Sequence, residues 1–405
     1  MKTSWIDNIN EKIIPYINQD DYEVRYPTLS AYEMPESERK ELQNLSANIV
    51  MCMSKLVEDI RKNSDIFPID VLNMTPKLTP FIRDDNSEYV SNIARIDFVK
   101  DMKGNFKLVE INADTPCAIP ETFYGNEVAR EYFNTMYSQR VLDKTAYPED
   151  VFDNLIWNGY GELKHPLHIC FASNKEYAED WANASFYKTL TDELLYDVAY
   201  SSDVNDIMTY LVDLKELIIK DDGVYVGDVK IDVLYRLHPI ELLMDDTSND
   251  GYPVGLKLMD LANQGKVILV NPIKAILMQN KAMLAIAQYA ARHTDYFNQD
   301  KFKYVNILTG KSSKDTMLFN IAPTSMDIAD FKGSKIIKKP IFGREGYGIS
   351  IIEADGSYSY TAEETDDCNF IYQQFVESPT ERVETDKGIW SGKFTYSCFV
   401  INTMP

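Results

Sequence analysis

The chain has 405 residues and a formal net charge of −22, from 63 acidic and 41 basic side chains. This charge argues against broad nucleic-acid binding. It fits cationic partners such as amines and equally a soluble acidic protein without such partners, and charge alone does not separate the two. A hydrophobic content of 45% and an aromatic content of 12% are typical of a folded protein with a substantial core, divided into two or three structural units.

The cysteines and the apolar runs predict a compartment. The five cysteines are scattered, odd in number and without Cys-x-x-Cys spacing, which argues against a disulfide framework or a zinc site. No apolar run is long enough to span a bilayer, and residues 1–17 lack the apolar core and cleavage site of a signal peptide. We therefore expect a cytoplasmic protein without membrane contact. The sequence carries no signal for an oligomeric state.

The first long predicted helix runs from about Pro35 to Asn63. Apolar residues recur along it at helical spacing, as they do on a helix that packs one face against a core. We expect this stripe to be buried: Leu42, Leu45, Ile49, Met53 and Leu56.

The next element, residues 94–116, reads as a β-hairpin with one polar face. Polar and apolar residues alternate on both sides of a Met102-Lys103-Gly104-Asn105 turn. If the turn centres on Lys103 and Gly104, opposed residue numbers sum to 207. Arg95 then faces Asn112 and Asp97 faces Glu110, with all four side chains on one face: Arg95, Asp97, Glu110 and Asn112.

Two opposed carboxylates repel, so Asp97 and Glu110 predict either a protonated group or a cation between them. With the Asn112 oxygen they form a donor set suited to Mg²⁺. Arg95 adds a fixed charge that would hold an anion or a developing oxyanion. The alternative is a solvated hairpin face with surface ion pairs.

Beyond the hairpin, a helix containing residues 126–134 precedes a linker at about 148–161. Strands and helices then alternate from about His165 to Ile273, with a strand predicted to begin near Ala199. The segments 231–237 and 266–272 are apolar strands of the buried, parallel type, which indicates a small α/β unit. No Gly-x-Gly-x-x-Gly fingerprint supports a dinucleotide-binding domain.

From Lys274 onward, a helix carrying Lys281 leads into a strand-rich region. Lys338 and Lys339 are adjacent on a strand and so point to opposite faces. The following loop contains Gly343, Gly346 and Gly348, which would let the backbone approach a phosphate closely. A flexible hairpin turn is the alternative, because this is not a Walker A pattern.

Five segments, in order, resemble the glutathionylspermidine synthase family, the C-terminal synthetase type with an ATP-grasp fold. The hairpin string RIDF followed by VEINADTP resembles the family's signature. The other matches are KIDVLYRLHPIELL at 230–243, NPIKAILMQNKAMLA at 271–285, KKPIFGREGYG at 338–348 and FIYQQF at 370–375.

The resemblance implies an α/β (α+β) fold: an ATP-grasp core with a small α/β pre-ATP-grasp substrate domain. It divides the chain into a helical region with the hairpin (1–160), the small α/β domain (161–273) and the nucleotide-binding region (274–405). The N-terminal amidase domain of some family members is not expected, because no convincing Cys-His nucleophile pair is present.

The activity implied by the resemblance is ADP-forming amide synthesis through an acylphosphate, with ATP and Mg²⁺ as cofactors. The acid would be a peptide or amino acid, and the amine a polyamine such as spermidine or another amine. Arg95 and Arg344 would be catalytic, and Asp97, Glu110 and Asn112 would hold the metal. The implied nucleotide contacts are Lys281, Lys339, Gly343, Gly346, Gly348, Gln374 and Phe375.

Two departures from the family pattern keep alternatives open. Thr115 and Cys117 fall where the family binds its thiol tripeptide through small hydroxyl residues, and Cys117 does not fit that pattern. The chain also ends at INTMP without matching the family's later glycine-rich segment and its arginine. The alternatives are therefore a nucleotide-binding module without ligase turnover and an ATP-dependent amino-acid ligase.

Overall fold

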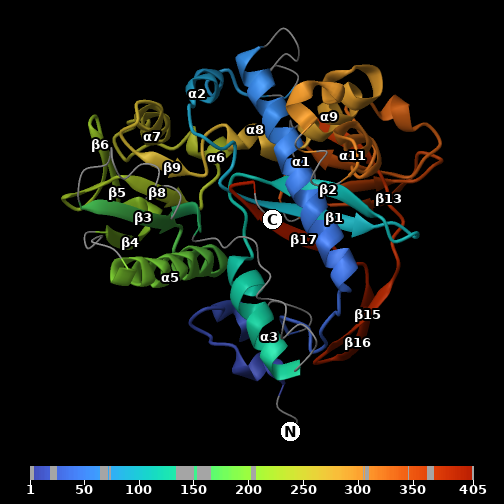
Figure 1. The fold of residues 1–405 in the computed structure, drawn as a ribbon, viewed down its shortest axis with the longest axis horizontal. Coiled ribbons are helices and arrows are strands. Elements are labelled where there is room, and N and C mark those ends of the chain that lie inside the picture. Colours follow the sequence, from blue (N-terminus) through green and yellow to red (C-terminus); the bar gives the residue numbers. More distant parts are fainter. Residues whose placement is uncertain are drawn as a thin grey trace.

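The computed structural model describes residues 4–18, 25–63, 72, 74–133, 150–152, 166–201, 207–303, 305, 310–344, 346–362 and 369–403, with backbone only for 195–201. Helices and strands are mixed, in agreement with the expected α/β ATP-grasp-like fold. Figure 1 shows one sheet region on the left, a central sheet behind a long helix, and helices and strands on the right.

The central sheet joins the hairpin to the end of the chain. Its strand order is β17-β1-β2, and both pairings are antiparallel. The three strands are β1 (Ile93–Lys100), β2 (Phe106–Asn112) and β17 (Tyr396–Ile401). The long helix α1 (Glu36–Lys62) crosses in front of this sheet in Figure 1.

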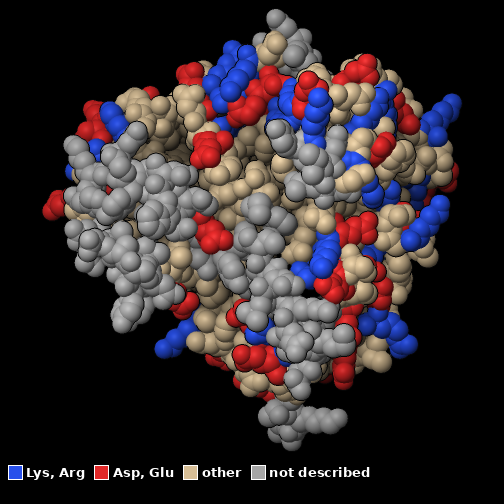
Figure 2. All heavy atoms as spheres, viewed as in Figure 1, with Lys and Arg blue, Asp and Glu red and all other residues tan. Residues whose placement is uncertain are grey.

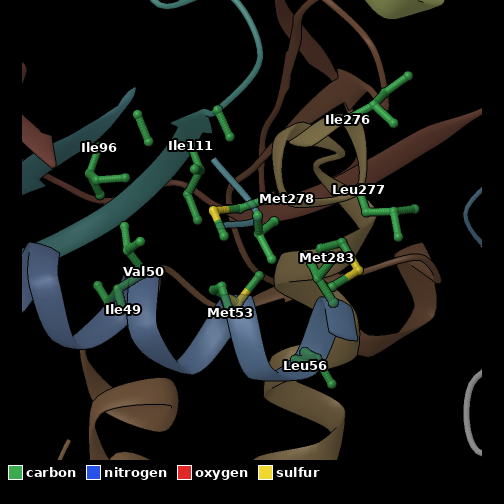
Figure 3. Close-up of a cluster of buried hydrophobic side chains, with 14 of the residues drawn as sticks. Ile49, Val50, Met53, Leu56, Ile96, Ile111, Ile276, Leu277, Met278 and Met283 are labelled. Carbon is green, nitrogen blue, oxygen red and sulfur yellow. The ribbon is translucent and has the colours of Figure 1, made fainter. Parts of the chain in front are cut away.

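The predicted α1 stripe is confirmed as core, because all five of its side chains are buried. Figure 3 shows Met53 and Leu56 of α1 near Met278 and Met283, with Ile96 and Ile111 of the hairpin above the helix. Each such side chain removed from water contributes roughly 1.5–3 kcal/mol. This packing fixes one face of the hairpin and leaves its polar face for other elements.

The predicted hairpin register is confirmed at the polar face and is wrong nearer the turn. Arg95 pairs with Asn112 and Asp97 pairs with Glu110, but Phe98 then pairs with Leu108, because a bulge interrupts the ladder. The extra residue is Val109, so the pairs beyond the bulge sum to 206 and the turn is not centred where the sequence suggested.

A four-stranded parallel sheet in the order β4-β3-β8-β9 forms the region on the left of Figure 1. Helix α5 lies on one side of it and α7 on the other. From β3 the chain adds β4 on one side, and from β8 it adds β9 on the other, so the strand order reverses between β3 and β8. Open α/β sheets bind ligands at such a switch point, beyond the carboxyl ends of the strands. These elements are β3 (Leu167–Ser173), β4 (Ile207–Asp213), β8 (Val233–Arg236), β9 (Ile268–Val270), α5 (Ala178–Ser201) and α7 (Val254–Asn263).

The strand predicted from Ala199 is wrong, because helix α5 continues through Ser201 and the following strand begins at Ile207. A three-stranded antiparallel sheet stands between β4 and β8 in the chain. It consists of β5 (Leu217–Lys220), β6 (Gly223–Val226) and β7 (Val229–Ile231).

The last large sheet has five antiparallel strands in the order β10-β14-β11-β12-β13. They are β10 (Thr324–Ser325), β11 (Ile336–Pro340), β12 (Ser350–Ile352), β13 (Tyr358–Thr361) and β14 (Phe370–Gln374). This sheet follows helices α8 (Ala275–Gln279), α9 (Ala282–His293) and α11 (Ser313–Phe319) in the chain. After the sheet, β15 (Glu381–Thr385) pairs with β16 (Gly388–Gly392) in a separate two-stranded sheet. The remaining short elements are Trp5–Asn8, Pro15–Asn18, α2 (Thr79–Asp84), Glu121–Gly125, α3 (Asn126–Phe133), Leu214–Glu216, α6 (Ile240–Leu243), Tyr296–Asn298, Asp300–Phe302 and Ile328–Phe331.

The surface in Figure 2 mixes charges of both signs. Acidic and basic side chains of the described residues are interspersed on this face, with uncharged atoms between them. Among the described helices, none has the length and apolar character that crossing a bilayer requires. The cysteines Cys52, Cys117, Cys170 and Cys398 are free thiols, and Cys368 lies outside the described residues.

Candidate functional site

On the polar face of the hairpin, the Asp97 carboxylate is neutralised by the neighbouring Arg95. Asp97 is buried, and its Oδ2 accepts from Arg95 Nη2 at 2.9 Å and from Asn112 Nδ2 at 2.9 Å. Ser397 of β17 donates to Asp97 Oδ1 at 2.7 Å. Arg95 also donates from Nη1 to the Cys117 carbonyl oxygen at 3.0 Å, which holds the chain beyond β2 against the hairpin.

The second carboxylate is paired from another element. Lys281 Nζ lies 2.8 Å from Glu110 Oε1 and donates to the Gly343 carbonyl oxygen at 2.8 Å. The sequence predicted Lys281 within a helix. In the structure a break at Asn280 separates α8 from α9, and Lys281 directly precedes α9. That break lets one lysine connect the hairpin and the glycine loop.

Lys339 lies beneath the same face and is buried. Its Nζ donates to Gln373 Oε1 at 2.8 Å and lies 3.4 Å from the carbonyl oxygen of Val109, the bulge residue. Burial lowers the pKa of Lys339, the Glu110 charge opposes the shift and the nearby Lys281 charge adds to it, and the resulting pKa is about 8. Lys338, its neighbour on β11, lies instead over the Phe370 ring at 3.8 Å.

Gln373 is a residue that the sequence reasoning missed. Its side chain is buried between Lys339 and the Thr324 hydroxyl, to which it donates at 3.0 Å. The strand alternation in the sequence could have identified it. Gln373 lies two residues after the apolar Ile371 and so shares its buried face of β14, whereas Gln374 is exposed on the other face.

The two residues expected at the adenine already use their backbone donors. Gln374 N donates to the Pro323 carbonyl oxygen at 2.7 Å, and Phe375 N donates to the Lys335 carbonyl oxygen at 3.0 Å. Any main-chain contact with a base would therefore come from carbonyl oxygens or require these bonds to change.

The glycine loop follows β11. Gly346 and Gly348 have φ values of +75° and +70°, a conformation that favours glycine. A Cβ on Gly343 would lie 3.3 Å from a carbon of Pro340, so a larger residue there would crowd the strand end. Arg344 forms an ion pair with Glu241 of α6, so the loop contacts the segment that follows the parallel sheet.

These elements enclose a cavity of about 420 Å³. It lies between the hairpin, the glycine loop and the carboxyl ends of β3 and β8. Eight of the predicted site residues line it: Arg95, Glu110, Asn112, Thr115, Cys117, Lys281, Gly343 and Arg344. Six do not: Asp97, Lys339, Gly346, Gly348, Gln374 and Phe375.

One part of the wall is acidic and was not predicted. It is formed by Glu121, Glu179 and Asp180, with Glu241 on the side of the glycine loop. Glu121 Oε1 accepts from Tyr16 Oη at 2.5 Å and from Tyr26 Oη at 3.2 Å. Its Oε2 is buried and has no hydrogen-bond partner among the described residues. The acidic side chains come from three separate helices, since Glu121, the adjacent Glu179 and Asp180, and Glu241 lie on different ones, so no sequence spacing connects the three positions.

Cys117 lies beside this acidic wall. Its Sγ is 3.8 Å from Asp180 Oδ1 and 3.8 Å from the Thr115 carbonyl oxygen. Burial, together with the Asp180 charge, raises the pKa of the Cys117 thiol to about 12. The thiol is therefore protonated near neutral pH and lacks the thiolate character of a nucleophile.

The donor set fits Mg²⁺ in chemistry, although the described residues contain no group of three or more His, Cys, Asp or Glu arranged around a metal. Mg²⁺ is commonly held by one or two carboxylates together with water and substrate phosphates. Glu110 and Asn112 face the cavity, and Asp97 stands behind them under Arg95. Arg95, Lys281 and Arg344 are basic residues that line the cavity, and Lys339 lies behind its wall, 3.4 Å from the Val109 carbonyl oxygen.

A family model matches residues 1–392 of the chain, and its description is glutathionylspermidine synthase pre-ATP-grasp. The chain belongs to this glutathionylspermidine synthase family. The description of this family names a synthase.

One curated relative of this glutathionylspermidine synthase family member is distant in sequence. An uncharacterized protein of Mycobacterium leprae (strain TN) is 21% identical over 270 residues, which are 64% of this chain and 42% of that protein. The match thus spans less than half of that relative.

Two solved structures resemble the chain at 10% identity. A glutathione synthetase-like effector from Globodera pallida, in its apo form, has a TM-score of 0.51 and covers 92% of this chain and 82% of its own. This likeness supports the fold. A putative gamma-glutamylcysteine synthetase from Methylobacillus flagellatus has a TM-score of 0.40, with coverage of 87% and 82%.

Proposed function

We propose that this protein is an ATP-dependent, ADP-forming ligase that joins a carboxylate to an amine through an acylphosphate. One observation carries the proposal: the hairpin face, Lys281 and the glycine loop meet around one cavity at the carboxyl edge of the parallel sheet. Phosphoryl transfer depends on positioning and on charge stabilisation, and this cavity offers both cations and oxygen donors.

Glu110 and Asn112, with Asp97 behind them, are the residues that would hold Mg²⁺. When bound there, the metal would neutralise charge on the phosphates. Lys281 and Lys339 would bind the phosphates, and Arg344 would orient the γ-phosphate toward the acid. We assign Arg95 to the oxyanion that develops when an amine attacks the acyl carbon and phosphate leaves.

The acidic wall supports a cationic amine such as a polyamine. Glu121 presents a buried oxygen without a partner among the described residues, and Glu179 and Asp180 add negative charge at the same end. An ammonium group would satisfy such oxygens by charge-assisted hydrogen bonds. The acid would then lie nearer Thr115 and Cys117, and both peptide and single amino-acid acids remain within the proposal.

A nucleotide-binding module without turnover is the second candidate, and one observation favours it. The charges expected to act are already paired within the protein: Asp97 with Arg95, Glu110 with Lys281, and Arg344 with Glu241. Such pairing would suit a site that binds but does not turn over.

Two measurements test these candidates. We expect calorimetry to show ATP binding that depends on Mg²⁺, and we expect ADP release that depends on an added amine and acid. Asp97→Asn and Glu110→Gln should each reduce ADP release, whereas Glu33→Gln, at an exposed carboxylate outside the cavity, should not. Mg²⁺-dependent binding without amine-dependent ADP release across a panel of acids and amines would support the binding module. Activity unchanged by both substitutions would remove the metal assignment.

A further inference from the structure

A cluster of buried polar residues lies behind the cavity and touches both of its halves. Asp114, Arg236 and Asn271 are each about 1% exposed, and none of them lines the cavity. Asp114 follows β2, Arg236 ends β8 and Asn271 follows β9. The three residues therefore join the hairpin to the carboxyl edge of the parallel sheet.

Asp114 makes four contacts with these elements. Its Oδ1 forms a buried ion pair with Arg236 Nη2, and its Oδ2 accepts from Ile240 N at 2.8 Å. Its backbone N donates to Gln279 Oε1 at 2.9 Å, and its carbonyl oxygen accepts from Asn271 Nδ2 at 2.9 Å. Both carboxylate oxygens thus face donors, which an aspartate satisfies and an asparagine cannot.

Arg236 and Asn271 extend the connection on each side. Arg236 Nη1 donates to the His238 carbonyl oxygen, which fixes the turn between β8 and α6. Asn271 Oδ1 accepts from the backbone N of Asn92 at 2.8 Å and of Ile93 at 2.9 Å, where β1 begins. Each strand of the hairpin is therefore tied to the parallel sheet.

The segments that this cluster holds carry cavity residues. Thr115 and Cys117 follow Asp114 directly, and the segment bound through Ile240 contains Glu241, the partner of Arg344. A shift of Asp114 would therefore move the wall formed by Thr115 and Cys117, where the acid is expected to lie, together with Glu241 on the side of the glycine loop. Lys281 contacts Glu110 of the hairpin and the Gly343 carbonyl oxygen of the glycine loop. Lys339 contacts the Val109 carbonyl oxygen of the hairpin and Gln373 of β14.

We propose that the Asp114–Arg236 pair is a positioning unit that fixes the acid side of the cavity, at Thr115 and Cys117, and the Glu241 segment relative to the hairpin. Its effect on turnover rests on the proposed ligase function, whereas its effect on the wall of the cavity does not. A purely stabilising ion pair would affect the whole fold equally. A positioning pair would change the wall and turnover while nucleotide affinity stays the same.

The test compares Asp114→Asn with Glu58→Gln in the full chain. Glu58 pairs with the buried Lys274 at 2.9 Å, so the control also converts an ion-paired carboxylate to an amide, but away from the cavity. Iodoacetamide labelling at pH 9, quantified by mass spectrometry for each cysteine, reports position because Cys117 lines the cavity. The raised pKa of the Cys117 thiol makes this labelling slow, and the variant and the wild type are compared at the same pH. Cys52 and Cys170 are fully buried and report general opening.

In Asp114→Asn the new amide NH₂ faces either the Arg236 guanidinium or the Ile240 backbone N, both of which are donors. We therefore expect the labelling rate of Cys117 to change by about 10-fold, while Cys52 and Cys170 keep wild-type rates. Amine-dependent ADP release should fall at least as much, with the Mg-ATP dissociation constant within about twofold of wild type. Glu58→Gln should lower thermal stability without either change.

The proposal is overturned if Cys117 keeps its wild-type rate in Asp114→Asn, or if its rate changes only together with Cys52 and Cys170. It is equally overturned if Glu58→Gln reduces ADP release as much as Asp114→Asn. A wild-type protein that shows no ADP release refutes the ligase function instead, and the Cys117 rates then still decide whether the pair positions the wall.

Discussion

Removal of the Lys281 charge should have opposite effects on metal and nucleotide. In the structure, Lys281 Nζ occupies the position beside Glu110 that a cation would take, with side chains 7% and 29% exposed, respectively. We expect Lys281→Met to strengthen Mn²⁺ binding in the absence of nucleotide and to weaken Mg-ATP binding. The reason is that the same ammonium repels a metal ion and attracts phosphates.

The magnitude follows from Coulomb's law. Two unit charges 4 Å apart interact by about 4 kcal/mol at an effective dielectric constant of 20, and a divalent ion doubles this. Solvent around the partly exposed Glu110 reduces the effect, so we expect at least a tenfold gain in Mn²⁺ affinity, or about 1.4 kcal/mol.

The assay is a Mn²⁺ titration followed by the loss of the free-ion paramagnetic resonance signal. Lys103→Met is the matched control, because it removes an equal charge from the exposed hairpin turn. The double variant Lys281→Met with Glu110→Gln should lose the gain, since the freed carboxylate is then absent. Unchanged Mn²⁺ affinity in Lys281→Met, or a gain that survives the Glu110 substitution, would refute this reasoning.

Three other outcomes are expected. Because burial lowers the pKa of Lys339 to about 8, Mg-ATP affinity should fall as the pH rises from 7 to 9, and Lys339→Arg should flatten that profile in calorimetry. Lys100→Met removes the ion pair with Glu38 and a cation over three aromatic rings, and should cost about 1–2 kcal/mol in urea unfolding. Burial tends to raise the pKa of Glu58, but hydrogen bonds from its basic neighbours, including Lys274, lower it to about 2. This carboxylate should therefore contribute about 1–2 kcal/mol above pH 4.5, a stability lost as the pH falls toward 2 and absent from Glu58→Gln at every pH.

The local pattern of the sequence determined the hairpin face and the long helix. Period-two alternation placed Arg95, Asp97, Glu110 and Asn112 together, because side chains of a strand alternate between its two faces. Helical spacing placed the α1 stripe in the core for the same kind of reason. Both depend on residues close in the chain, so no distant contact had to be known.

The ends of elements were less certain from sequence, because tertiary contacts determine them. The bulge at Val109 and the break before Lys281 each serve a distant contact: the Val109 carbonyl oxygen reaches Lys339, and Lys281 reaches Glu110. Neither contact has a sequence signal within its own element.

Only the tertiary structure decided which charges neutralise one another. Asp97 and Glu110 predicted a cation between them, and the structure supplies Arg95 for one and Lys281 for the other. In the acidic wall, Glu121 and Glu179 are 58 positions apart in the chain. Asp114 and Arg236 are 122 positions apart. Such pairings depend on how the sheets pack, because electrostatic interactions act through space and are blind to separation along the chain.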